Sequence, residues 1–314
     1  MSPGAQLQKP QNPAPEPGSF RERVITNQSS YVRPEAWGLR HLHLLDCDIL
    51  TTDAANEGSR DTISASVEND VRIAYALDTL LGAPGTSSKD AAARALFRLL
   101  IPKDKSLFKA SSSPPQFFFD CRPVVRTPCP VLFRASTTNR PVFAFLDKTW
   151  LSEQRYKLWS HKPVKAAHQR VQQMNKLSFD PYYAGLLISM AQDSRSSTPE
   201  GDIEVHLFSP STNYESFIQY SASVSPEYLQ KFDKTYKFSS HHLTITQKKM
   251  PVSEPSVITE ALRQIGQRCK VSPENPVLRK RKAMSDITNR LDVPSSTKDA
   301  YEAKRFCRRE NPYD

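Results

Sequence analysis

Four consecutive cationic residues stand near the end of the chain, in a polar stretch that leaves their side chains accessible. Short runs of Lys and Arg fit the acidic groove of a nuclear import receptor, and they also neutralise nucleic-acid phosphates. The alternative is that these side chains are simply hydrated and bind no partner. We expect a nuclear localisation signal with an import receptor as its partner, and the cytoplasm is the alternative location. The residues are Arg279, Lys280, Arg281 and Lys282.

A second pattern overlaps this cluster over Arg281–Asn289 (RKAMSDITN). It resembles the destruction box that the anaphase-promoting complex reads, which follows R-x-x-L-x-x-I-x-N. Arg281, Ile287 and Asn289 match that pattern, whereas Met284 stands where the box has Leu. The resemblance implies a degradation signal in the C-terminal tail.

The segment Lys148–Lys176 combines cationic and aromatic side chains. Seven Lys and Arg residues stand against one acid, Glu153, and Trp150, Tyr156 and Trp159 lie among them. Cationic groups can contact phosphates while exposed rings stack on bases. Large aromatic residues usually anchor a core, and we favour that role for these rings while the charge stays open. The candidate nucleic-acid contacts are Lys162, Lys165, Arg170 and Lys176, of which Lys165 and Arg170 should lie off the apolar side of their helix.

The order of the predicted elements raises the possibility of an enzymatic function, because helix, three strands, helix, strand resembles the restriction-endonuclease-like nuclease fold. Such a site needs an acid and a nearby acid-x-Lys on adjacent strands, to hold Mg²⁺ and orient water. Asp120 and Glu68 could supply carboxylates. The third strand, however, ends Leu146-Asp147-Lys148, with no residue between acid and lysine. The motif is therefore absent or degenerate.

Other enzyme classes lack their signatures as well. The chain has only nine glycines and contains neither a dinucleotide-binding nor a P-loop motif, whose backbones need glycine to approach phosphate. Neither G-x-S-x-G nor H-E-x-x-H occurs. We expect no cofactor, and a non-enzymatic protein is favoured over an enzyme.

One compact set of possible metal ligands consists of His41, His43 and Cys47. On a strand, His41 and His43 would share a face, but a third ligand at a workable distance is not evident, and a closed zinc site needs four. A packed or surface histidine pair explains these residues, so no metal is expected. The five cysteines are widely spaced without a C-x-x-C, which favours a reducing compartment.

The elements that must position these residues lie between two polar segments. Residues 1–35 and 270–314 lack apolar periodicity, so we expect them to be disordered tails, the second one basic. A single α/β domain should occupy residues 36–269. The predicted fold class is α+β, with a mostly antiparallel sheet packed by helices.

Apolar spacing, caps and turn residues define the expected elements. Two helices follow Ser66 and Ser88 as N-caps, and Trp37–Leu50 could be a strand or a short helix. Tyr182–Ala191 is apolar on nearly all sides, which predicts a central buried helix. Further helices should begin at Pro163, Pro226 and Pro255, the last ending near Gly266, and strands are predicted over Phe117–Val125, Val131–Thr137, Pro141–Asp147, Ile203–Phe208, Ser216–Val224 and His242–Gln247.

Two stretches of the predicted domain are similar to stretches in a group of filamentous-fungal proteins without an assigned activity. They are Tyr182–Ser189 and Gln219–Phe232 (QYSASVSPEYLQKF). The likeness spans about the second half of the domain and implies no activity for this chain.

The formal net charge of +10 favours acidic partners, namely nucleic acid or an acidic protein face. No apolar run approaches the ~20 residues of a membrane span, so no membrane partner is expected. We predict a non-enzymatic nuclear binding or regulatory protein. The alternative is a nucleic-acid-binding protein with a nuclease-like, catalytically degenerate scaffold. The oligomeric state stays open.

Overall fold

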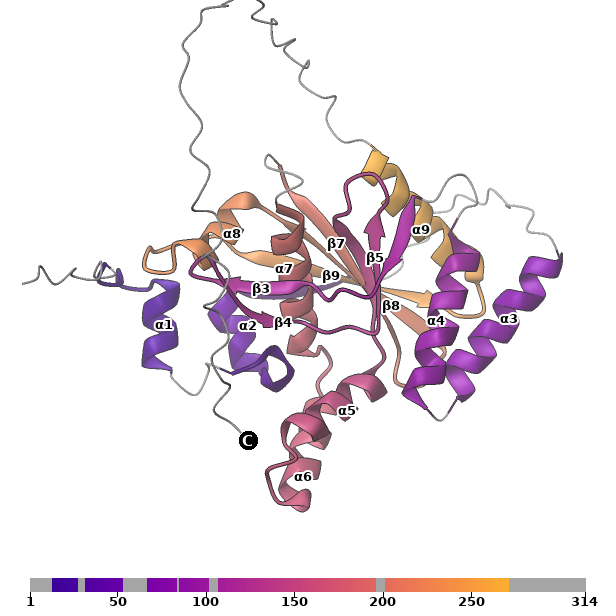
Figure 1. Ribbon diagram of the computed structural model, residues 1–314, viewed down its shortest axis with the longest axis horizontal. Helices are drawn as coiled ribbons and strands as arrows, with labels where there is room; N and C mark the ends of the chain where they lie inside the picture. Colours follow the sequence, from indigo (N-terminus) through magenta and orange to yellow (C-terminus); the bar gives the residue numbers. More distant parts are fainter. Residues whose placement is uncertain are drawn as a thin grey trace, which may run out of the picture. The chain divides into compact units, whose positions relative to one another are not determined.

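The computed structural model describes residues 13–27, 32–52, 67–83, 85–101, 107–195 and 201–270. They belong to one unit, Met1–Ser272, and the second unit, Pro273–Asp314, lies outside these ranges. Within the described ranges, seven strands pair in the order β1-β9-β8-β7-β6-β5-β2, and β3 and β4 form a separate small sheet (Figure 1). The strands are Cys47–Thr52 (β1), Phe108–Ser111 (β2), Gln116–Phe119 (β3), Arg122–Arg126 (β4), Val131–Ala135 (β5), Pro141–Phe145 (β6), Ile203–Pro210 (β7), Ser216–Val224 (β8) and Leu243–Pro251 (β9).

Most neighbouring strands of the large sheet run antiparallel. The parallel pairs are β1 with β9 and β6 with β7, and the other four pairs are antiparallel. Side chains alternate between the two faces, so Leu132 of β5 enters one core cluster and Phe133 the other. The predicted α+β fold with a mostly antiparallel sheet is confirmed.

Helices cover both faces of this sheet. They span Phe20–Thr26 (α1), Leu39–Leu45 (α2), Val67–Gly82 (α3), Thr86–Leu100 (α4), Lys148–Leu158 (α5), Val164–Asn175 (α6), Pro181–Ser194 (α7), Pro226–Asp233 (α8) and Pro255–Lys270 (α9), and Pro34–Ala36 forms a 3-10 turn, η2. One core cluster joins α3, α4 and α9 to the sheet, and the other joins α2, α7, α8 and β3 to its opposite face. The hairpin of α5 and α6 lies beyond the end of the sheet (Figure 1). None of the helices in the described ranges is long and apolar enough to cross a membrane.

The central helix α7 is buried along its length, as its sequence predicts. Asp180 caps its N-terminus by accepting a hydrogen bond from the Tyr182 amide, and Pro181 occupies the first turn, where no amide donor is needed. Gly185 lets the helix approach Trp37, because a Cβ atom there would lie 2.9 Å from the Trp37 ring. The close contact between α7 and Trp37 therefore depends on the missing side chain of Gly185.

Part of the fold follows the expected order of helix, three strands, helix, strand. The helix is α4, the strands β2, β5 and β6 form an antiparallel meander, and α7 leads to β7, which runs parallel to β6. This order holds only when inserted elements are set aside, because β3 and β4 stand between β2 and β5 along the chain, and α5 and α6 stand between β6 and α7. Its first strand is β2 and not the predicted Phe117–Val125.

The single strand predicted over Phe117–Val125 is wrong. This stretch folds into the β3–β4 hairpin, whose turn holds Asp120 and Cys121 at φ angles of 55° and 58°. Left-handed backbone is uncommon for residues other than glycine. This turn places Asp and Cys at its left-handed positions, so the usual Gly or Asn-Gly signal of a hairpin turn is absent from the sequence.

Three further boundaries differ from the prediction. The stretch Trp37–Leu50 contains both alternatives, since α2 is followed directly by β1. Helix α4 begins at Thr86 with Gly85 as its N-cap, about one turn before the predicted N-cap, Ser88. The last helix continues through Gly266 to Lys270, and α5 occupies a stretch for which no element was predicted.

The prediction that residues 1–35 lack packing is wrong for α1 and η2. Phe20 is buried, and its ring centroid lies 5.5 Å from that of Phe119 and 5.3 Å from that of Phe232. Burial of a large aromatic side chain offsets part of the entropy that an otherwise polar segment loses on ordering. Residues 1–12 and 271–314, including most of the predicted basic tail, lie outside the described ranges.

Replacing Gly185 with Ala should destabilise the protein, although Ala is the better helix former. The added methyl group meets Trp37 and Pro34 at 2.9 and 3.3 Å, and such overpacking costs about 1–3 kcal/mol. The matched control is Gly82→Ala at the end of α3, where no atom lies within 4 Å of the new methyl group. Urea unfolding should show a loss for G185A only, and equal midpoints for both variants would refute the packing account.

Candidate functional site

A buried ion pair stands at the end of β6, where a nuclease-like scaffold would carry its catalytic residues. Asp147 caps α5 by accepting a hydrogen bond from the Thr149 amide. Its other oxygen lies 3.4 Å from the Lys89 ammonium and accepts from the Tyr214 hydroxyl at 3.3 Å. Lys89 also donates to Tyr214 at 2.8 Å. Both carboxylate oxygens of Asp147 are thus engaged within the protein.

The charge of Lys89 is preserved in this buried setting. Burial alone would lower the pKa of the ammonium, but the hydrogen bond to Tyr214 and the charge of Asp147 outweigh it, so the pKa is raised. The arrangement is therefore a closed, internally neutralised pair. A hydrolytic Mg²⁺ site needs carboxylate oxygens that are free to coordinate, and Asp147 offers none.

Two further carboxylates lie near this pair. Asp90 follows Lys89 on α4, and Glu153 lies on α5. Burial raises the pKa of Asp90 to about 6; Arg94 opposes that rise, and the charges of Asp147 and Glu153 add to it. Asp90 Oδ1 is buried without a hydrogen-bond partner among the described residues. The ionised Asp90 carboxylate therefore destabilises the folded state at neutral pH.

The candidate nuclease carboxylates Asp120 and Glu68 belong to elements that pack on opposite faces of the large sheet. Asp120 lies in the β3–β4 turn, where it accepts from the Thr235 hydroxyl at 3.3 Å and pairs with Arg21 at 4.0 Å. Glu68 belongs to α3, which packs on the opposite face of the large sheet. The hypothesis of a carboxylate site built from these two residues is therefore wrong.

The predicted basic segment forms the α5–α6 hairpin. Lys165, Arg170 and Lys176 are exposed and Lys162 is half-buried, so Lys165 and Arg170 lie off the apolar side as expected. The apolar side of α6 packs through Ala167 and Val171, whereas Val164, which shares their helical spacing, is 86% exposed.

One of the seven cations of this segment is not at the surface. Arg155 is fully buried and makes two hydrogen bonds of 2.7 Å to the carboxylate of Asp180. Its Nε also donates to the backbone carbonyl of Glu35 at 2.9 Å. Six cations against Glu153 therefore remain at least partly exposed in Lys148–Lys176.

The aromatic rings of the segment serve mainly as packing. Trp159 is 4% exposed, and Trp150 packs against the main core. Tyr156 reaches the surface, where its hydroxyl pairs with His168 Nδ1 at 2.7 Å. Arg170 lies over the Trp159 ring at 5.1 Å. The expectation that both tryptophans anchor the core describes their positions better than a stacking platform for bases does.

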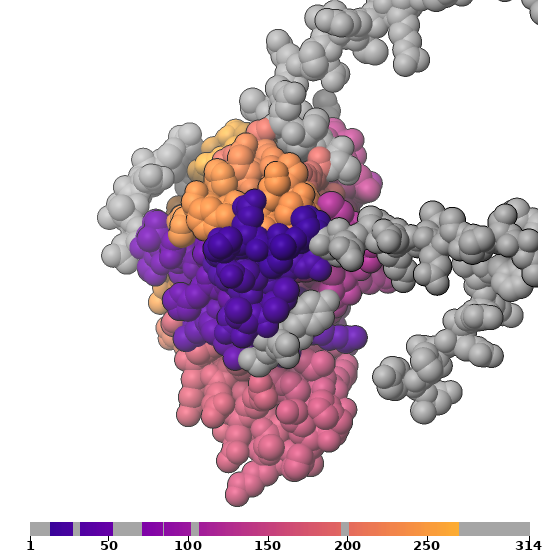
Figure 2. Space-filling model, turned by 90° about the vertical axis from the view of Figure 1, so that its left-hand side faces the viewer, coloured from indigo at the N-terminus to yellow at the C-terminus, as the bar shows by residue number. Residues whose placement is uncertain are grey.

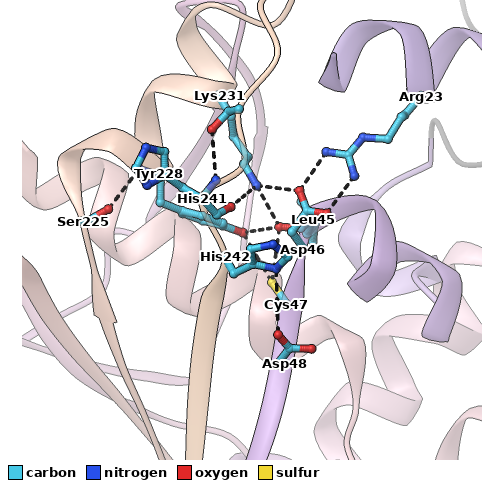
Figure 3. A network of polar contacts seen from close by, with 11 residues as sticks. Arg23, Leu45, Asp46, Cys47, Asp48, Ser225, Tyr228, Lys231, His241 and His242 are labelled. Atoms are coloured by element: carbon cyan, nitrogen blue, oxygen red, sulfur yellow. Dashed lines mark hydrogen bonds and ion pairs between the residues drawn. The ribbon is translucent and has the colours of Figure 1, made fainter. Parts of the chain in front are cut away.

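A second polar network ties the N-terminal segment to α8 (Figure 3). Asp46, at a φ of 53°, accepts two hydrogen bonds of 2.8 Å from Arg23 and one of 2.8 Å from the buried ammonium of Lys231. Burial lowers the pKa of Lys231, which Asp46 partly restores. Lys231 also donates to backbone carbonyls of Leu45 and His241, so its donors are used internally. We interpret this network as structural.

The compact set His41, His43 and Cys47 does not converge on one point. His41 stacks on Trp37 with ring centroids 5.7 Å apart, and His43 is exposed. Cys47 contacts the Tyr228 hydroxyl at 3.3 Å, and burial raises the pKa of its thiol to about 12. Among the residues that the structure describes, no group of three or more His, Cys, Asp or Glu side chains could hold a metal ion.

The predicted import signal and degradation signal both lie outside the described residues. This concerns Arg279, Lys280, Arg281 and Lys282 together with Met284, Ile287 and Asn289. The site residues that sequence reasoning missed are Lys89 and Tyr214, which are brought to Asp147 from 58 and 67 positions away along the chain. No local pattern marks such a contact.

No family model, no curated protein and no solved structure matches this chain.

Replacing Asp90 with Asn should stabilise the protein at neutral pH. The folded state holds the Asp90 proton more tightly than the unfolded chain does, because the pKa of the carboxyl is raised on folding. The stability that this proton gives the folded state is therefore fully present below about pH 4 and is lost as the pH rises through about 6. We expect D90N to gain about 1 kcal/mol at pH 7, after allowance for solvent screening at this half-buried group, and nothing below pH 4.

Urea unfolding at several pH values measures this difference. Asp78→Asn, an exposed position on α3, controls for the loss of one surface carboxylate. A gain for D90N that is the same at pH 4 and pH 7 would contradict the assignment.

Proposed function

We propose that this chain is a non-enzymatic nuclear protein that binds nucleic acid through the α5–α6 hairpin, on a nuclease-like scaffold without a catalytic centre. The observation that supports the proposal most directly is the exposed charge of the hairpin. Six cations against one acid are at least partly exposed in a projecting helical pair (Figure 1). Nucleic-acid backbones are bound chiefly through such sequence-independent phosphate contacts.

Two exposed lysines, one in α6 and one at its C-cap, suit a phosphate track. Lys165 and Lys176 are eleven positions apart, which brings them to nearly the same side of the helix at about 16 Å along its axis. That side is opposite the buried residues Ala167 and Val171. Arg170 points sideways over Trp159, so it has a packing role that Lys176 lacks.

A nuclease centre is left out of this proposal because other side chains occupy the positions where it would stand. Phe143, Ala144 and Phe145 fill β6 and are completely buried in the core clusters. The acid that follows, Asp147, is closed off by Lys89 and Tyr214. A strand that must present an acid-x-Lys motif to solvent cannot do so with these residues.

Reversing the charge of Lys165 and Lys176 should weaken binding to labelled duplex DNA. Each lysine that contacts a phosphate contributes about one ion to the salt dependence, so K165E/K176E should flatten the slope of log affinity against log salt by about 2. The melting temperature should stay nearly unchanged, because both side chains are exposed.

Lys234→Glu with Lys237→Glu is the matched control, since both lysines are exposed and lie near α8, away from the hairpin (Figure 1). The control should retain the affinity and slope of the parent. No binding of DNA or RNA by the parent at low salt would remove the proposal. A parent that binds an acidic protein instead would replace nucleic acid by that partner class.

The nuclear part of the proposal depends on the basic cluster of the tail. Changing Arg279, Lys280, Arg281 and Lys282 to Ala should shift a fluorescently tagged protein from nucleus to cytoplasm, because an acidic receptor groove loses its ligands. Arg308→Ala with Arg309→Ala is the control for loss of tail charge. Unchanged nuclear fluorescence in the quadruple variant would place the import signal elsewhere. The degradation signal over Arg281–Asn289 remains a prediction.

A further inference from the structure

An apolar groove lies between the N-terminal helices and the small sheet. It has a volume of about 240 Å³, and α1, η2, α2, β3 and β4 all contribute to its lining. Four aromatic rings, those of Phe20, Trp37, Phe117 and Phe119, line it. Figure 2 faces this side of the molecule, with α1 and α2 in indigo above the pink α5–α6 hairpin. Pockets lined chiefly by aromatic and aliphatic side chains are the usual binding sites of protein surfaces.

The rings of the groove hold one another in place. Trp37 and Phe117 meet edge to face at 5.6 Å, and Phe20 lies 5.5 Å from Phe119. The Trp37 indole donates to the carbonyl of Val32 at 3.0 Å, so its polar atom is satisfied. The aromatic lining is therefore ordered by contacts within the protein.

Apolar side chains that are not buried in the core are exposed around the groove. Val32 and Val124 both line the groove and are 42% and 45% exposed, although they come from segments far apart in the chain. Ile25, next to the lining residue Val24, is 52% exposed. Exposed apolar side chains beside a hollow are typical of protein contact sites.

Three arginines lie in or beside the segments that line the groove. Arg33 lines the groove, and Arg122 and Arg126 stand at the two ends of β4, on either side of the lining residues Val124 and Val125. Among the ion pairs between described residues, none includes these three arginines. The charge of Arg33 also acts on the Glu35 carboxylate. Arg122 and Arg126 are therefore the guanidinium groups that acidic residues of an occupant would find without an ion-pair partner among the described residues.

The small sheet leaves one side open to an extended chain. The outer edge of β3 is closed by Gln192, whose side chain bonds both the amide and the carbonyl of Phe118 at 2.9 and 3.0 Å. Strand β4 has no strand partner other than β3 within the described ranges. An occupant that runs along β4 could contact the groove and both flanking arginines at once.

We propose that this groove binds a peptide segment of a partner protein, in which a bulky apolar anchor is flanked by acidic residues. The anchor enters among the four rings, and the acidic flanks pair with Arg33, Arg122 and Arg126. The tails of this chain suit it less well, because neither is acidic as a whole. Residues 1–12 contain no acid, and in residues 271–314 ten Lys and Arg residues outnumber seven Asp and Glu residues.

The test is fluorescence anisotropy with the full-length protein and a labelled synthetic peptide, in which a central Leu-Trp pair is flanked by aspartates. Val124→Asp places a carboxylate at the exposed rim and should weaken binding at least tenfold. Arg122→Glu with Arg126→Glu should do the same through the flanks. Val164→Asp is the matched control, because Val164 is more exposed still but lies on α6; it should leave the affinity unchanged.

Peptide variants separate the two parts of the proposal. Replacing the aspartates by lysines, or the Leu-Trp pair by serines, should abolish saturable binding. Equal or tighter binding of the lysine peptide would overturn the proposal in favour of the chain's own basic tail. Saturable binding of dodecanoate without peptide binding would make the groove a small-molecule site. Failure of the parent to bind the acidic peptide, with an unchanged melting temperature, would also overturn it.

Discussion

The ion pair between Arg155 and Asp180 is the contact on which three parts of the molecule depend. It is bidentate, at 2.7 Å for both hydrogen bonds, and both side chains are almost completely buried. The same Asp180 caps the central helix α7, and the same Arg155 donates to the carbonyl of Glu35 in η2. Removing either partner would leave a buried charge without compensation, which typically costs 3–5 kcal/mol.

This arrangement explains why a charged residue stands in the middle of the hairpin that carries the proposed binding surface. Arg155 is the only one of the seven cations of Lys148–Lys176 that is buried. It anchors α5 to α7, and that anchor lets the other cations project into solvent. Cation–carboxylate geometry of this kind suits Arg better than Lys, because the planar guanidinium donates two parallel hydrogen bonds.

The sequence predicted the elements whose signals are local. Helix α7 could be recognised because Asp180 and Pro181 precede a stretch that is apolar on all sides. Helix α5 escaped prediction because its buried face includes Arg155, whose partner lies 25 positions away, so the local apolar pattern is weak. The β3–β4 turn escaped because its left-handed residues, Asp120 and Cys121, are not glycine. The contacts of Asp147 and the lining of the groove are likewise long-range, and no spacing rule reports them.

The groove is formed before any partner binds, because η2 is held from three directions. The carbonyl of Glu35 accepts from Arg155, and Pro34 and Trp37 pack against Gly185 of the central helix. On its other side, Ala36 packs against the small cluster of Trp159, Ala167 and Val171 in the hairpin. A wall fixed in this way loses little conformational entropy on binding, so the cost of ordering falls mainly on the partner peptide. The same element thus supports both proposed surfaces: one side of η2 backs the basic hairpin, and the other side forms the wall of the apolar groove.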